Sequence, residues 1–146
     1  MIYQEEFHVK TNKRREVINI TENIREIIKK SGIKNGIILI FVPHATAGLL
    51  VNEDEENIRK DYLNLFERLV PENGKYYHNL IDNNADSHLL SSLFKQFYIL
   101  PVKDGELYRG TWQEIFLAEF DGPRERRIFV TIIGEWNTIN IDYLIL

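Results

Sequence analysis

Apolar and polar residues alternate along the first part of the chain in the manner of half-buried strands. This pattern predicts strands at 2–10 and 15–20, joined by a polar turn over 11–14. From Gly36 to Val42 the apolar residues run without a break, which predicts a strand buried on both faces. A loop of small residues around His44 should follow this strand.

Helical spacing appears in two places between these strands. The first helix should begin at Thr21, a good N-cap residue, and end at Gly32, with an apolar stripe of Ile24, Ile27 and Ile28. The second should cover residues 54–69, where Ile58, Tyr62, Leu65 and Leu69 share one face.

The second half of the chain consists mainly of strand patterns. A short helix capped by Asp86 or Ser87 should run to Ser92. Strands are then predicted at 97–102, at 106–120 as one strand or a pair, at 127–134 and at 138–146.

This order of elements predicts one α+β domain over residues 1–146, with a twisted, largely antiparallel sheet or sandwich and two main helices. The chain has no glycine-rich turn from strand to helix, so a doubly wound nucleotide-binding fold is not expected.

Composition narrows the possible partners and compartment. The 146 residues are 44% hydrophobic and 27% charged, with a net charge of −4, so nucleic acid is not an expected partner. The longest apolar run, Ile37 to Val42, is far shorter than the ~20 residues of a membrane helix. There is no cysteine for a disulfide or a thiolate site, and no secretory leader is visible, so we expect a cytoplasmic protein without membrane contact.

Three of the four histidines lie in sequence surroundings that suit chemistry. His44 follows a buried strand, whereas His78 and His88 bracket a polar stretch; His8 lies in ordinary strand alternation. Each could be structural when considered alone. Together, His44, His78 and His88 could bind a divalent metal ion of the zinc or magnesium class, or could act as general acids and bases. Their spacing matches no compact zinc motif.

Charged residues near a tight turn form a second candidate group. Glu119 and Asp121 should point to the same face of a strand, and Arg124 follows the turn. They could form a surface ion pair, or the carboxylates could act at a metal while Arg124 binds a phosphate. Trp112 could pack against a flat surface.

Several segments of the chain resemble the YjbQ family, also called uncharacterised protein family 0047. The motifs are His44-Ala45-Thr46-Ala47-Gly48-Leu49 with Val51-Asn52-Glu53, Leu69-Val70-Pro71, His78, His88-Leu89 with Ser91-Ser92-Leu93, Pro101-Val102, Gly105, Gly110-Thr111-Trp112-Gln113 and Glu119-Phe120-Asp121-Gly122-Pro123-Arg124. They occur in order over residues 3–134. The chain differs from the family pattern at Ala45, at Lys95-Gln96-Phe97 and at Ile81-Asp82-Asn83-Asn84, so its substrate preference could differ.

The resemblance implies a homotrimer with histidine-containing clefts near its subunit interfaces. It also implies an activity of the thiamine-phosphate synthase type, in which a hydroxymethylpyrimidine diphosphate joins a hydroxyethylthiazole phosphate and pyrophosphate is released.

We therefore expect an enzyme acting on phosphorylated small molecules. The alternatives are another metal-assisted small-molecule reaction, or a homotrimer that binds a metal or an anion without catalysis. The expected catalytic residues are His44, His78, His88, Glu119 and Asp121, with the three histidines also as metal ligands. The expected ligand-binding residues are Arg124, Arg126, Trp112, Gln113, Thr46 and Asn52.

Overall fold

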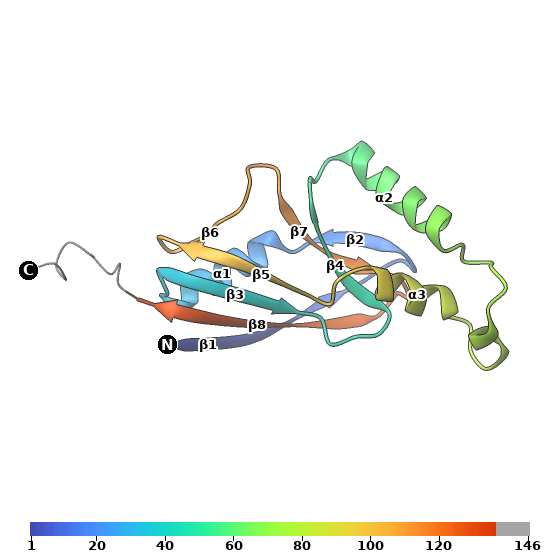
Figure 1. Ribbon diagram of the computed structural model, residues 1–146, viewed down its shortest axis with the longest axis horizontal. Coiled ribbons are helices and arrows are strands. Elements are labelled where there is room, and N and C mark those ends of the chain that lie inside the picture. Colours follow the sequence, from blue (N-terminus) through green and yellow to red (C-terminus); the bar gives the residue numbers. More distant parts are fainter. Residues whose placement is uncertain (137–146) are drawn as a thin grey trace, which may run out of the picture.

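Two antiparallel sheets of unequal size form the centre of the protein (Figure 1). The computed structural model describes residues 1–136, and the strand expected at 138–146 lies outside them. The larger sheet has the order β1 (Ile2–Lys10), β8 (Glu125–Glu135), β3 (Asn35–Phe41), β5 (Phe97–Lys103) and β6 (Glu106–Leu107). The smaller sheet has the order β2 (Glu16–Asn19), β7 (Glu114–Glu119) and β4 (Ala47–Asn52).

The small sheet is the middle layer of the fold. One of its faces, with Leu49, Ile115 and Leu117, packs in a single core with the large sheet and with α1 (Thr21–Ser31). Its other face, with Phe116 and Phe120 of the β7 segment, packs against α2 (Glu56–Leu69) and α3 (Ala85–Leu93). A short 3₁₀ helix, η1 (Tyr77–Leu80), connects α2 to α3. No helix within residues 1–136 is long and apolar enough to cross a membrane.

The structure confirms the α+β class and the largely antiparallel sheets predicted from the sequence. The predicted return segment 106–120 is a pair of strands, β6 and β7. Strand β4 was not predicted, because its short apolar run contains Gly48 and follows a loop-like Pro43–Thr46 segment.

The starts of two helices differ from the predictions. Ile20, not Thr21, occupies the cap position of α1, and the Thr21 hydroxyl instead accepts the backbone N–H of Ile115 at 2.9 Å. Helix α3 begins at Ala85, and neither Asp86 nor Ser87 caps it. Both side chains are buried: Asp86 pairs with two arginines and Ser87 donates to the carbonyl of Phe120. The side chains expected to cap the helices therefore bind groups from other parts of the fold.

Strand β3 was expected to be buried on both faces, and this prediction was wrong. Ile38 and Ile40 are buried, whereas Ile37 and Phe41 on the opposite face are about 40% exposed. Strand β7 is the one buried on both faces, because it is the central strand of the middle layer. Within residues 1–136, the outer face of the large sheet thus carries exposed apolar residues with no covering layer.

A buried ion pair joins the two sheets. Glu119, the last residue of β7, is fully buried, and Arg126 of β8 is 3% exposed. Arg126 Nε lies 2.9 Å from Glu119 Oε1, and Arg126 Nη2 lies 2.5 Å from Glu119 Oε2. The carboxylate also accepts the Thr11 hydroxyl and the backbone N–H groups of Phe120 and Asp121.

Removing one partner of this pair should strongly destabilise the fold. In Glu119→Ala, the guanidinium of Arg126 stays buried without its counter-charge, a situation that costs about 3–5 kcal/mol. Urea unfolding of the variant should show this loss of unfolding free energy. The control is Glu22→Ala, which breaks the exposed Glu22–Arg25 pair and should cost about 0.5 kcal/mol or less. Equal losses in the two variants would contradict a stabilising role for the buried pair.

Candidate functional site

His44 lies in the loop between β3 and β4, beside three arginines. Its Nε2 accepts the backbone N–H of Arg127 at 2.9 Å, which fixes the ring against β8. Partial burial lowers the pKa of His44 below its ordinary 6.5, and the nearby charges of Arg126, Arg127 and Arg124 lower it further, against a smaller opposing effect of Glu119. The imidazole is therefore neutral at neutral pH, in positively charged surroundings.

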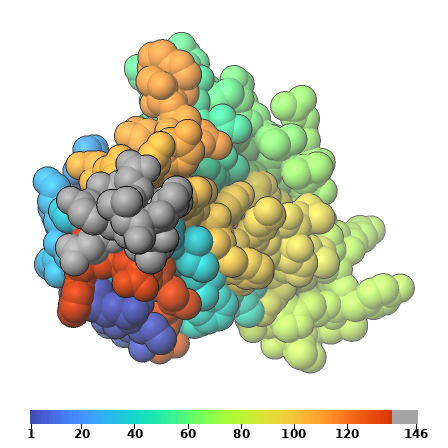
Figure 2. All heavy atoms as spheres, turned by 60° about the vertical axis from the view of Figure 1, so that its left-hand side comes forward, coloured from blue at the N-terminus to red at the C-terminus, as the bar shows by residue number. Residues whose placement is uncertain are grey.

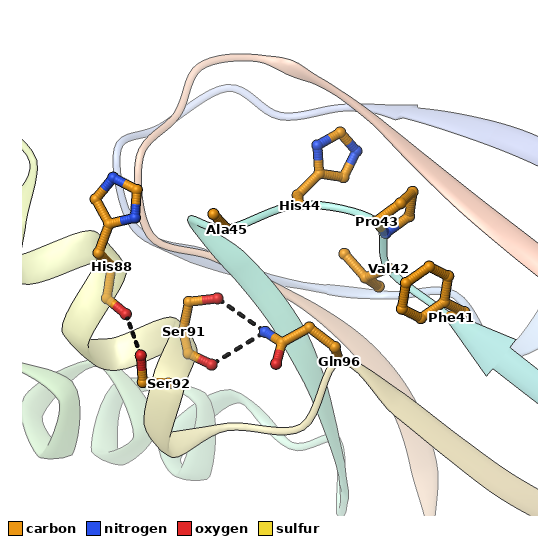
Figure 3. A pocket seen from close by; sticks show the side chains of 9 residues that line it. All are labelled: Phe41, Val42, Pro43, His44, Ala45, His88, Ser91, Ser92 and Gln96. Carbon is orange, nitrogen blue, oxygen red and sulfur yellow. Dashed lines mark hydrogen bonds between the residues drawn. The ribbon is translucent and has the colours of Figure 1, made fainter.

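His44 and His88 line the same cavity of about 400 Å³ (Figure 3). In Figure 3 their rings project to the same side, with the small side chain of Ala45 between their positions. The wall of this cavity is rigid, because the side-chain amide of Gln96 donates to the carbonyl and hydroxyl of Ser91 at 3.0 and 2.8 Å. Ser92 donates to the carbonyl of His88 at 2.8 Å.

His88 also lines a second cavity, of about 600 Å³, together with His78. The two rings meet edge to face, with centroids 5.0 Å apart and an interplanar angle of 81°. The remaining wall is largely apolar and aromatic, formed by Lys75, Tyr76, Tyr77, Ala85 and Leu89. His88 is thus the residue shared by the two cavities.

A polar connection, buried at its inner end, runs from His78 to the turn after β7. Nε2 of His78 lies 3.1 Å from Oδ1 of Asn84, and Nδ2 of Asn84 donates to Oδ2 of Asp121 at 3.0 Å. Asp121 also accepts from Arg14 at 3.2 Å and from Arg124 at 2.9 Å. Asp121 therefore holds this turn and orients Asn84, and Arg124 is partly committed to Asp121.

The arrangement of the three histidines does not fit the expected metal site within one chain. Among residues 1–136, no three His, Asp or Glu side chains are grouped so that they could hold one metal ion. The Nε2 lone pair of His44 is also committed to a backbone N–H, and a metal ligand needs a lone pair that is free. His78 could coordinate through Nδ1, because its other nitrogen has a partner.

Glu119, Arg126 and Thr46 lie beneath the site and do not line either cavity. Glu119 was expected to be catalytic and Arg126 to contact ligand, but each is committed to the other in the core. Arg126 also donates to the carbonyl and hydroxyl of Thr46, at 3.1 and 2.9 Å. All three are buried, so in this chain they hold the His44 loop from below and line neither cavity.

Trp112, Gln113 and Asn52 lie away from the histidines. Trp112 is 72% exposed in the β6–β7 loop, which projects from the molecule far from α3 in both views (Figures 1 and 2). Gln113 uses its side chain to accept the N–H of Gly110 at 2.8 Å, and Asn52 uses its side chain to accept that of Glu53. One chain does not bring these residues to the cavities.

Sequence reasoning missed Asn84 and Arg127 as site residues. Asn84 lay inside the polar stretch between His78 and His88, but only the fold shows that it bridges His78 to Asp121. Arg127 could have been found from strand alternation, because neighbours on a strand point to opposite faces. Arg126 is buried on β8, and Arg127 is about half exposed on the other face.

The pKa values of His44 and His8 should be shifted in opposite directions from the ordinary histidine value. Ion pairs with Glu125 and Glu6 raise the pKa of His8 above 6.5, whereas the pKa of His44 is lowered. The contribution of His8 to stability should therefore be present below pH 6.5 and be lost as the pH rises through its folded-state pKa. That of His44 should be present above pH 6.5 and be lost as the pH falls through its folded-state pKa. An NMR titration of the ring protons, assigned with His8→Gln and His44→Gln, should place the midpoint of His44 below that of His8. The reverse order would contradict the described environments.

The chain matches known proteins over nearly its whole length. A sequence model described as UPF0047 protein YjbQ-like matches residues 5–135. A UPF0047 protein of Methanothermobacter thermautotrophicus is 42% identical over 92% of this chain and 94% of its own. The UPF0047 protein YugU of Bacillus subtilis is 36% identical over 86% of this chain and 96% of its own.

Solved structures agree with these sequence matches. The crystal structure of a YbjQ-like protein of unknown function from Sulfolobus solfataricus is similar with a TM-score of 0.90 and 44% identity, over 92% of this chain and 99% of its own. A YjbQ/UPF0047 family protein of Clostridium acetobutylicum is similar with a TM-score of 0.84 and 35% identity, over 88% of this chain and 99% of its own. With its motifs, its fold and both kinds of match in agreement, this chain belongs to the YjbQ-like UPF0047 family.

Proposed function

We propose that this chain is an enzyme that binds a phosphorylated small molecule across the two cavities joined at His88. The single observation that carries the proposal is the contrast between these cavities. One contains His44 in a positively charged environment, and the other is mainly apolar and aromatic. A ligand with an anionic group attached to a ring would match both.

The His44 side offers groups that suit phosphate oxygens. Arg124 and Arg127 line neither cavity, but each is about half exposed and close enough to influence His44 by its charge. Guanidinium groups bind phosphate by paired, charge-assisted hydrogen bonds. Arg126 adds positive charge from beneath without direct contact, because it is buried.

The His78 side offers a surface for a ring. Tyr76, Tyr77 and Leu89 line this cavity with Lys75 at its margin. Aromatic walls bind flat heterocycles through their apolar faces and their quadrupoles. His78 and His88 would then lie beside the ring, where they could exchange protons with its polar substituents.

The reaction that we propose first is of the thiamine-phosphate synthase type. A ring nitrogen of the thiazole phosphate would attack the methylene carbon of the pyrimidine diphosphate, so that a C–N bond forms while the C–O bond to the diphosphate breaks. The departing pyrophosphate would carry the bonding electron pair. Arg124 and Arg127 would stabilise that charge as it develops. A divalent ion on the leaving diphosphate would add to this stabilisation, but no protein metal site is needed for the proposal.

The test is binding and turnover with purified protein. Inorganic pyrophosphate, the pyrimidine diphosphate and the thiazole phosphate should each bind in calorimetry, and the last two together should give product. His88→Ala should reduce turnover by about 10-fold or more, equivalent to about 1.4 kcal/mol of transition-state stabilisation. The control His8→Gln should stay within about 2-fold of the wild type, because its ring bonds only to Glu6 and Glu125 among residues 1–136, and it lines neither cavity.

Each result bears on a different part of the proposal. Binding without turnover would overturn the enzymatic part and favour the alternative of an anion-binding protein. No binding of any anion, or loss of activity in His8→Gln equal to that in His88→Ala, would overturn the assignment of the site.

We also propose that the chain forms a homotrimer through the outer face of the large sheet. This face carries exposed apolar side chains on four neighbouring strands: Ile2, Ile37, Phe41, Phe97, Ile99 and Ile133. An apolar sheet face of this extent is typical of a protein interface. Phe41 belongs both to this face and to the His44 cavity, so the proposed interface would adjoin the site.

Charge on this face should prevent assembly. Ile99→Lys places an ammonium group within the proposed apolar interface, so sedimentation at micromolar concentration should give a monomer. The wild type and the control Leu65→Lys, on the exposed side of α2, should both sediment as trimers. A monomeric wild type would refute the trimer, and an unaffected Ile99→Lys trimer would place the interface elsewhere.

A further inference from the structure

His44 and His78 each share a cavity with His88. Each also has one ring nitrogen hydrogen-bonded to a partner that acts either only as a donor or only as an acceptor. The polarity of that partner determines which nitrogen of a neutral imidazole carries the proton. The two partners are of opposite kinds.

The partner of His44 can only donate. It is the backbone N–H of Arg127, at 2.9 Å from Nε2. Nε2 must therefore be the unprotonated nitrogen, and the proton of the neutral ring must be on Nδ1. Neutral free histidine favours the other form, so the backbone of β8 holds His44 in its less common tautomer.

The partner of His78 can only accept in its observed position. Asn84 is buried, and its Nδ2 donates to the carboxylate of Asp121. A carboxylate between two guanidinium groups offers no proton, so the NH₂ of Asn84 must face Asp121 and its oxygen must face His78. Nε2 of His78 therefore carries the proton, and Nδ1 has a lone pair.

We infer that His44 and His78 have fixed and opposite roles in the two cavities that share His88. His44 is a hydrogen-bond donor through Nδ1–H, and His78 is a proton acceptor through Nδ1. In this inference Asn84 is a positioning residue: its NH₂ donates to Asp121, so its oxygen is the group that accepts from His78. A ligand that places an anionic oxygen at His44 and an O–H or N–H group at His78 matches both rings.

This polarity also specifies a proton path. A ligand O–H or N–H that loses its proton gives it to Nδ1 of His78, which becomes an imidazolium ion. The Nε2–H of that ion still donates to Asn84, so the connection to Asp121 is not broken. His44 keeps its proton throughout and stabilises negative charge on the ligand, which is the role of an anion-binding donor and not of a metal ligand.

The inference rests on the proposed function only for the identity of the ligand, because ring states can be measured without one. Protein containing ¹⁵N-labelled histidine should be studied at neutral pH by long-range proton–nitrogen correlation. His44→Gln and His78→Gln would assign the signals. His44 should be the Nδ1–H tautomer, and His78 should be the Nε2–H tautomer.

A variant of Asn84 tests the positioning role. Asn84→Ala removes the acceptor at 3.1 Å and leaves the exposed carboxylate of Asp82, 4.0 Å from Nε2, as a neighbour, so the Nε2–H signal of His78 should shift and lose intensity. Asn83→Ala, at an exposed neighbour, should leave the signal unchanged. If Asn84→Ala does not fold, the wild-type ring states still decide the matter, because an Nδ1–H tautomer at His78 would overturn the inference.

Titration with inorganic pyrophosphate and with Zn²⁺ then separates the two roles of His44. Pyrophosphate should shift the Nδ1–H signal of His44, whereas Zn²⁺ should leave its proton in place. An Nε2–H or doubly protonated His44 in the ligand-free protein, replacement of its proton by Zn²⁺, or a His78 signal unaffected by Asn84→Ala would each overturn the inference. If both tautomers are as inferred but pyrophosphate does not bind, the inference about the two histidines stands and the result contradicts the proposed function alone.

Discussion

The pairing of Glu119 with Arg126 between the two sheets is the interaction on which the site depends. The charges are removed from water, and this is tolerable only because every oxygen of the carboxylate has hydrogen-bond donors. The same pair is linked to the His44 loop through the buried Thr46, which Arg126 holds by its carbonyl and hydroxyl. The loop that carries His44 is thus anchored to the core at Thr46, two residues after His44.

A second polar assembly supports the other side of the cleft. Asp121, two residues after Glu119, holds Asn84 and through it His78, while Arg14 joins Asp121 to the buried Asp86 at the start of α3. The carboxylates of one short turn therefore position both histidine-bearing segments. Glu119 and Asp121 thus bond to residues that support the cavity walls, and neither carboxylate lines a cavity.

The layered arrangement explains why the site opens where it does. The small sheet is covered on both faces, by the large sheet and by α2 with α3, so β7 has no free side. The large sheet has no covering layer on its outer face within the described chain, and exposed apolar residues remain on β3, β5 and β8. The His44 cavity lies next to this face and shares Phe41 with it.

The sequence by itself determined the class of fold and most of the strands, and it singled out the three histidines that line the cavities, because period-two alternation, helical stripes and family motifs are local signals. It could not decide which apolar strand is central, since β3 and β7 both read as continuous apolar runs and only the second sheet covers β7 on both faces. It also could not separate ligand-facing residues from supporting ones. Glu119, Arg126 and Thr46 look like site residues in the motifs, yet contacts between segments far apart in the chain bury them. Asn84 joins the candidate site only because the fold brings Asp121, which is 37 residues away in the sequence, beside it.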